Sequence, residues 1–294
     1  MLNIPKYVVT DEAIAAHVHI EKPCPDIVVS AGPCRSGTTF YVQVFAQSGF
    51  EVWRQPLKSI LRGQVHKNAP HFRIANAEFV FVKETLGPTT NAASFNPIKI
   101  LLAAGVPAEK IHFLVIARDP FATATSWIEQ FAHFETRENL VRTCLLSYES
   151  IQNIKQYAVS IGIRTTTIVY DAWRDNVPAV VVQKLFTRIG YPSSRSAFSG
   201  WVPLKKMEAA GKNIYSIPQP DIYDRNLKSY YEKVNKSTGI TYYNKPLNVI
   251  REKLSPALIE QIAQSRALQI YRELTQATEL DLGIKIELIP MIGL

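Results

Sequence analysis

The sequence has few cysteines, and it lacks both a long hydrophobic run and a dense basic segment. Its three cysteines, Cys24, Cys34 and Cys144, make no paired disulfide framework, which favours a reducing compartment and predicts a cytoplasmic location. No segment approaches the roughly 20 apolar residues that span a bilayer. The N-terminal segment also lacks the apolar stretch of a signal peptide. We therefore expect no membrane partner.

The basic residues are dispersed, although the formal net charge is +8 at pH 7. A basic surplus suits an anionic ligand, a nucleic acid or an anionic surface equally well. Because no Lys/Arg cluster forms a continuous track, we expect a local anion pocket and no nucleic-acid partner. The oligomeric state is left open by these features.

A glycine-bearing turn stands out in residues 26–41, which read DIVVSAGPCRSGTTFY. A strand, a turn and a helix N-terminus together make an anion site, because backbone N–H groups point outward and the helix dipole favours negative charge. Gly32 and Gly37 have the spacing of a phosphate-binding P-loop, but Thr38 stands where the usual lysine would be. Arg35 is the side-chain cation inside the turn.

Short apolar segments alternate with helical segments through the first two thirds of the chain. The predicted strands are Ile27–Ala31, Glu51–Arg54, Phe79–Lys83, Ile111–Ala117 and Thr165–Tyr170. The predicted helices are Gly37–Gln47, Asn96–Ala104, Pro120–Phe134, Glu138–Val159 and Pro178–Ile189. This alternation predicts an α/β fold of the three-layer P-loop type, with a mostly parallel central sheet flanked by helices.

The whole chain, residues 1–294, is expected to form a single domain, because no repeat or low-complexity linker interrupts it. Residues 26–192 are the predicted nucleotide-binding core. Residues 193–254 are rich in Ser, Pro, Gly, Lys and Tyr and predict a loop-rich lid or substrate region. Residues 255–278 predict one C-terminal helix.

Polar residues directly follow the other predicted strands. Lys83-Glu84-Thr85 follows the third strand, Arg118-Asp119-Pro120 the fourth, and Tyr170-Asp171 the fifth. Asp119 before Pro120 is expected to cap a helix. Because ligands bind at the carboxyl ends of parallel strands, we expect these groups and the glycine-bearing turn to share one edge of the sheet.

Taken together, these segments resemble the sulfotransferase family that uses 3′-phosphoadenosine 5′-phosphosulfate (PAPS). The family loop reads Pro-x-Arg-Ser-Gly-Thr-Thr, and the chain has Pro33 followed by Arg35 to Thr39, with Cys34 between Pro33 and Arg35. Arg118 and Ser126, eight residues later, match the family's second motif. The resemblance covers residues 26–192 and carries over the family's activity, which transfers a sulfuryl group to a hydroxyl or amine of a small molecule.

The resemblance implies roles for individual residues. The expected contacts to the 5′-phosphosulfate are Arg35, Ser36, Gly37, Thr38 and Thr39. Arg118 and Ser126 would hold the 3′-phosphate, which suits the planar fork of an arginine. Phe40 and Tyr170 would contact the adenine. No metal is expected, because a sulfuryl group carries less charge than the triphosphate that a kinase holds with Mg²⁺.

The catalytic base is open between Glu84 and a histidine. Glu84 could accept the acceptor's proton if burial raises its pKa toward the working pH. It could instead be a carboxylate paired with Lys83 or Arg118. Lys83, with Arg35, is expected to stabilise the leaving oxygen electrostatically. The rival bases are His66, His71 and His133, and a late basic loop with Lys205, Lys206 and Lys212 has no assigned motif.

Two other functions remain open at this stage. One is a P-loop NTP-dependent kinase, which the missing lysine argues against. The other is a non-catalytic nucleotide-binding protein on the same scaffold. Neither the identity of the acceptor nor its pocket is specified by these motifs.

Overall fold

A six-stranded sheet forms the centre of the computed structural model, which describes residues 9–74, 77–191, 194–203, 213–217 and 237–288. The strand order is β7-β6-β2-β5-β3-β8, and each of the neighbouring pairs is parallel. The strands are β2 (Asp26–Ala31), β3 (Glu51–Arg54), β5 (Phe79–Lys83), β6 (Ile111–Ala117), β7 (Arg164–Val169) and β8 (Ile214–Ser216). A separate parallel pair joins β1 (Val18–Ile20) to β4 (Phe72–Ile74).

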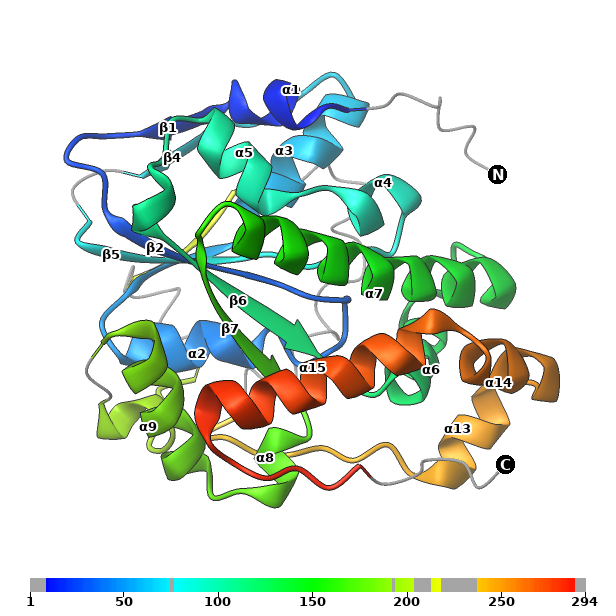
Figure 1. Ribbon diagram of the computed structural model, residues 1–294. Coiled ribbons are helices and arrows are strands. Elements are labelled where there is room, and N and C mark those ends of the chain that lie inside the picture. The colour runs from blue at the N-terminus through cyan, green and yellow to red at the C-terminus, as the bar shows by residue number, and fades with distance from the viewer. Residues whose placement is uncertain (1–8, 75–76, 192–193, 204–212, 218–236, 289–294) are drawn as a thin grey trace.

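Helices cover both faces of this sheet (Figure 1). One face carries α2 (Phe40–Gln47) and α9 (Pro178–Ile189), and the other carries α3 (Pro56–Val65), α5 (Pro97–Ala103) and α7 (Arg137–Ser160). The other α-helices of the described residues are α1 (Asp11–Ala15), α4 (Thr90–Ser94), α6 (Pro120–Phe131), α8 (Ala172–Asp175), α13 (Leu247–Lys253), α14 (Pro256–Ala263) and α15 (Arg266–Leu282). The chain is therefore an α/β protein with a parallel sheet between helical layers.

The five predicted strands are confirmed to within one residue at each end. Strand β6 is buried along its whole length, as a central parallel strand must be when helices cover both faces. The predicted cap of α6 is also confirmed, since Asp119 accepts a hydrogen bond from the Ala122 N–H at 2.9 Å.

The predicted single helix over residues 255–278 is wrong. The chain forms α14 and α15, separated at Gln264 and Ser265. The Ser265 hydroxyl donates to the Ile262 carbonyl at 2.7 Å, and serine side chains that bond the backbone in this way compete with helix continuation. Helix α6 likewise ends at Phe131 instead of Phe134, and α2 begins at Phe40 instead of Gly37.

Helix α15 runs along the edge strand β7 and protects its outer N–H groups. Asp281 accepts from the Thr167 N–H at 2.8 Å, and Thr278 accepts from the Val169 N–H at 3.1 Å. Unpaired strand edges favour intermolecular pairing, so these side chains close one edge of the sheet. They also bring the start of α15 toward the carboxyl end of β7.

Among the described residues, no helix combines the length and the apolar character needed to cross a lipid bilayer.

Candidate anion site

The turn after β2, residues 32–39, is called the anion loop below. It lies at the carboxyl edge of the sheet and runs beside the segment that follows β5. The Cys34 N–H donates to the Leu86 carbonyl at 2.9 Å, and the Leu86 N–H donates to the Gly32 carbonyl at 2.8 Å. These two bonds continue the parallel pairing of β2 with β5 beyond the strands, so the first half of the loop is fixed to the sheet.

Two glycines in the anion loop allow close approaches that a side chain would prevent. A Cβ atom at Gly32 would lie 1.9 Å from the Ile116 carbonyl oxygen of β6. Gly37 has φ +85°, and a Cβ atom there would lie 2.5 Å from the ring of Tyr170. Glycine is therefore needed at both positions, because the loop packs against residues at the ends of the neighbouring strands with no room for a side chain.

The second half of the anion loop presents backbone donors. Within the described part of the chain, the N–H groups of Gly37, Thr38 and Thr39 have no hydrogen-bond acceptor. They immediately precede α2, where the helix dipole adds partial positive charge. The Ser36 hydroxyl is already used, since it donates to the Pro33 carbonyl at 2.6 Å. The loop thus offers an anion three successive N–H groups.

Arg35 and Ser126 lie together. The Arg35 Nε–H donates to the Ser126 hydroxyl at 3.2 Å, and Arg35 has a positive φ of 68°. A non-glycine residue in this backbone region costs of order 1 kcal/mol or more, which tertiary contacts must offset. Ser126, on α6, thus contacts the loop arginine, and its expected role beside Arg118 at the 3′-phosphate stays a prediction.

Arg118 is held against Tyr170 by a segment from far along the chain. The Arg118 guanidinium lies 4.7 Å from the centre of the Tyr170 ring and donates to the Tyr243 carbonyl at 2.9 Å. The Tyr243 N–H in turn donates to the Tyr170 hydroxyl at 3.0 Å. Tyr242 stacks on Tyr170, with ring centres 4.9 Å apart. Residues 240–243 therefore lie over the ends of β6 and β7.

Asp171 anchors this segment. Its carboxylate accepts hydrogen bonds from Tyr242 at 2.8 Å and from Tyr271 of α15, and it pairs with Arg174 at 3.1 Å. Because Tyr170 already contacts Arg118, Tyr242 and the backbone of Gly37, little of its ring is left for an adenine. Phe40, half-buried and packed edge-on to Trp173 at 5.0 Å, keeps more of its ring accessible.

Glu84 is completely buried at the start of α3. Its Oε1 accepts from the Leu57 N–H at 2.8 Å, while Oε2 has no hydrogen-bond partner among the described residues. Burial raises the pKa of Glu84 to about 7, although the Leu57 amide, Lys58 and Lys83 act in the opposite direction. This pKa suits a general base, but the carboxyl group is enclosed and accepts a hydrogen bond from the N-terminus of α3.

Lys83 is 4% exposed at the end of β5. Within the described chain its ammonium group makes no hydrogen bond or ion pair. Burial lowers the pKa of Lys83 to about 8, and the nearby Cys34 partly opposes that change. A buried ammonium without a bonded partner is costly, which makes it a candidate ligand for an anion.

The raised pKa of Glu84 predicts a pH dependence of stability. A carboxyl whose pKa rises from 4.5 to about 7 on folding stabilises the native state below pH 4.5, and this contribution is lost as the pH rises to 7. The change is about 3 kcal/mol. Urea unfolding of Glu84→Gln at pH 5 and pH 8 should show a smaller pH difference than the natural protein.

The control for that experiment is Glu149→Gln, which replaces an exposed carboxylate on α7. Asp119, with a pKa raised to about 6 by burial, contributes equally to all three proteins. Equal pH differences for Glu84→Gln and the natural protein would contradict the assignment.

The rival histidines lie away from this edge. Helix α3 starts at the carboxyl end of β3, and at 1.5 Å per residue its ten residues carry the chain about 15 Å away before His66 and His71. Because α6 ends at Phe131, His133 lies beyond the helix, although the predicted helix Pro120–Phe134 included it. Lys205, Lys206 and Lys212 fall outside the described residues.

Sequence reasoning missed a buried lysine beneath the anion loop. Lys58 of α3 donates to the Cys34 sulfur at 3.3 Å and to the Thr85 hydroxyl at 2.9 Å. The available signal was a lysine within the mostly apolar run Pro56 to Leu61. A charged residue on the buried face of a helix is unusual and indicates a specific partner.

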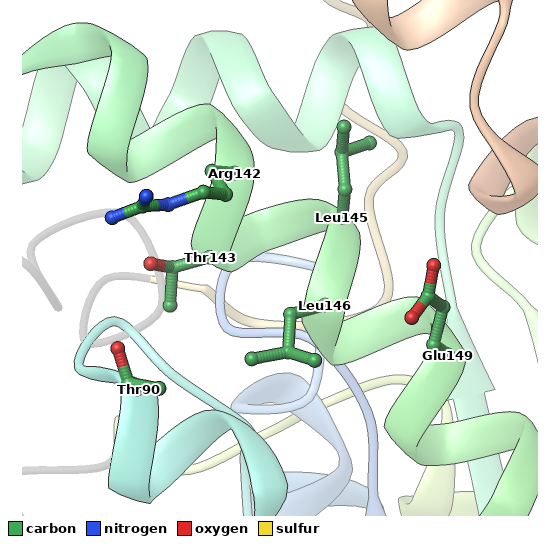
Figure 2. A pocket seen from close by; sticks show the side chains of 6 residues that line it. All are labelled: Thr90, Arg142, Thr143, Leu145, Leu146 and Glu149. Atoms are coloured by element: carbon green, nitrogen blue, oxygen red, sulfur yellow. The ribbon is translucent and has the colours of Figure 1, made fainter.

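A separate depression lies between α4 and α7 (Figure 2). Its lining residues are Thr90, Arg142, Thr143, Leu145, Leu146 and Glu149. Arg142 and Glu149 stand at its opposite ends in Figure 2, so charges of both signs flank it without converging on one point. None of the predicted site residues lines it.

No protein-family model matches this sequence, and a search of curated proteins finds no significant match.

Proposed function

We propose that the chain is a PAPS-dependent sulfotransferase of the three-layer P-loop type that acts on a hydroxyl or amine of a small molecule. The observation that carries this proposal is the position of the anion loop. Arg35 and three N–H groups without an acceptor among the described residues follow β2 at the carboxyl edge of a parallel sheet, and the buried Lys83 ends the neighbouring strand β5. Such an edge is where α/β proteins bind phosphorylated ligands.

The donor suits two groups of residues. The anion loop, with Arg35, would hold the 5′-phosphosulfate through N–H donors and a guanidinium. Arg118, at the end of β6, would hold the 3′-phosphate once it exchanges the Tyr243 carbonyl for a phosphate oxygen. Ser126 would join either phosphate through its contact with Arg35. Phe40 would contact the adenine.

In the proposed reaction the acceptor oxygen or nitrogen forms a bond to sulfur while the bond from sulfur to the bridging phosphate oxygen breaks. Adenosine 3′,5′-bisphosphate leaves with the bonding electrons, and the proton of the acceptor passes to a base. Lys83 and Arg35 would stabilise the negative charge on the leaving oxygen. Glu84 has a suitable pKa for the base but would need an opening at the start of α3 to reach an acceptor.

The first test of the function is ligand binding. Adenosine 3′,5′-bisphosphate at about 100 times its Kd should raise the melting temperature by roughly 5 °C, because it binds the folded chain alone. Mg·ATP at the same concentration should produce a much smaller shift. Stabilisation by Mg·ATP and not by adenosine 3′,5′-bisphosphate would instead support a kinase.

The second test is turnover. Labelled PAPS incubated with a panel of alcohols, phenols and amines should yield a sulfated product. Binding of adenosine 3′,5′-bisphosphate without transfer to any acceptor of the panel would favour a non-catalytic nucleotide-binding protein.

A further inference from the structure

Lys58 is a fully buried cation whose described partners are neutral or weakly acidic. It lies in the first turn of α3, is 0% exposed, and forms no ion pair with a carboxylate among the described residues. Its two hydrogen bonds go to Cys34 of the anion loop and to Thr85 after β5. The dipole of α3 further disfavours the charged form of Lys58, since a positive charge is unfavourable at a helix N-terminus.

The hydrogen bonds around Thr85 form a complete set. Its hydroxyl oxygen accepts from Lys58 and from the Gln55 amide, which uses both lone pairs. The hydroxyl proton is then available for the Cys34 sulfur at 3.2 Å. The Cys34 thiol can donate in turn to the Gly87 carbonyl, also at 3.2 Å.

These contacts give Cys34 a structural role in the loop. Cys34 connects the anion loop to α3 through Lys58 and to the segment after β5 through Thr85 and Gly87. The Trp127 indole N–H also donates to the Cys34 carbonyl at 2.6 Å. A loop residue with this many fixed contacts determines where the following N–H groups point.

We propose that Lys58 is a positioning residue that holds the anion loop through Cys34 and adds, from α3, a second positive charge beside a loop in which Thr38 occupies the usual lysine position. The ligand class is the phosphosulfate group, and this part rests on the proposed function. The effect of Lys58 on a simple anion in the same loop does not depend on it.

The charged and titratable groups that act on Lys58 come from three sides. Cys34 of the loop favours its charged form, whereas Arg62 of α3 and Lys83 of β5 disfavour it. Glu84, at the end of β5, is influenced by Lys58 in turn. Burial lowers the pKa of Lys58 to about 8, so the lysine is charged at pH 7 and neutral at pH 9.5.

Two substitutions separate charge from hydrogen bonding. Lys58→Gln keeps a polar group for Thr85 and Cys34 but has no charge, and Lys58→Met removes both. The probes are adenosine 3′,5′-bisphosphate and inorganic pyrophosphate, measured by titration calorimetry at pH 7 and pH 9.5. The matched control is Lys155→Met, which removes a half-buried lysine from α7.

We expect both Lys58 variants to bind each probe about tenfold more weakly than the natural protein at pH 7. At pH 9.5 the difference for Lys58→Gln should nearly disappear, because the natural lysine is then neutral as well. If Lys58→Gln weakens binding by the same factor at both pH values, the role of Lys58 is purely structural and the charge assignment is overturned. An unchanged affinity of Lys58→Gln at pH 7 would also overturn the charge assignment.

A third measurement tests the Cys34 contact without any ligand. The nearby Lys58 charge, the Thr85 hydrogen bond and Lys83 lower the pKa of the Cys34 thiol against the opposing effect of burial. Alkylation of Cys34 by iodoacetamide, followed peptide by peptide, should be slower in Lys58→Gln at pH 7, and pyrophosphate should slow it in the natural protein. Equal rates in both proteins would contradict the coupling.

The binding measurements distinguish the proposed function from the proposed role of Lys58. Binding of pyrophosphate that weakens in Lys58→Gln at pH 7, without any binding of adenosine 3′,5′-bisphosphate, would remove the proposed function and support the role of Lys58 in the loop. Binding of adenosine 3′,5′-bisphosphate that is indifferent to Lys58→Gln at both pH values would keep the function and remove the role of Lys58.

Discussion

Arg35→Ala should weaken binding of adenosine 3′,5′-bisphosphate by about 10- to 100-fold, because a charge-assisted hydrogen bond contributes about 1.5–3 kcal/mol. Arg35 is the cation inside the anion loop, and its contact with Ser126 already directs it toward α6. The variant should fold normally, since alanine at this position removes no core side chain. Titration calorimetry of the purified variants measures the effect.

A matched control for this experiment is Arg142→Ala. Arg142 is an exposed arginine on α7 that lines the separate depression of Figure 2. Arg142→Ala lowers the net charge of the protein by the same amount as Arg35→Ala. It therefore measures how much of the loss in affinity comes from weaker long-range attraction of the ligand. Equal affinities for Arg35→Ala and Arg142→Ala would mean that the ligand binds elsewhere.

Gly37→Ala should both destabilise the chain and abolish ligand binding, because the new Cβ atom meets the Tyr170 ring. The left-handed backbone conformation costs an alanine about 1–2 kcal/mol, and the clash at 2.5 Å adds about 1–3 kcal/mol. The loop can relieve the clash only by moving its N–H groups away from their present directions. Urea unfolding and calorimetric titration report the two effects separately.

The chain offers a close control in Gly105→Ala. Gly105 has φ +86°, nearly identical to the +85° of Gly37, but a Cβ atom at Gly105 would have no described neighbour within 4 Å. This variant should lose only the backbone contribution and keep its ligand affinity. If Gly37→Ala and Gly105→Ala behave alike in both measurements, the close packing of Tyr170 against the loop has no functional consequence.

The local features of the site followed from the sequence because each depends on a few neighbouring residues. The strand ends that carry Lys83 and Arg118 were predicted to the residue, and Asp119 caps α6 as expected. Burial raises the pKa of Glu84 to about 7, which meets the condition set for a base at this position. The roles of these side chains toward a donor stay predictions until the binding experiments are done.

The pairings between distant side chains did not follow in the same way. Ser126 contacts Arg35, and Arg118 contacts Tyr243, and neither contact follows from the spacing of these residues in the sequence. Glu84 caps the start of α3 instead of pairing with a cation, because the helix supplies an amide donor inside an apolar environment. Spacing along a strand and helix cannot specify such contacts, since the partners come from segments up to 125 residues apart.

The sequence by itself determined the α/β alternation, the strand ends and the glycine-bearing loop, because apolar periodicity and turn chemistry act over short distances. Only the tertiary structure decided what surrounds that loop. It brings Lys58 of α3 under Cys34 and residues 240–243 over Tyr170, contacts that depend on how helices and late segments pack on the sheet. The sequence shows that Thr38 replaces the usual lysine of the loop, whereas only the fold shows that Lys58 lies beside the loop.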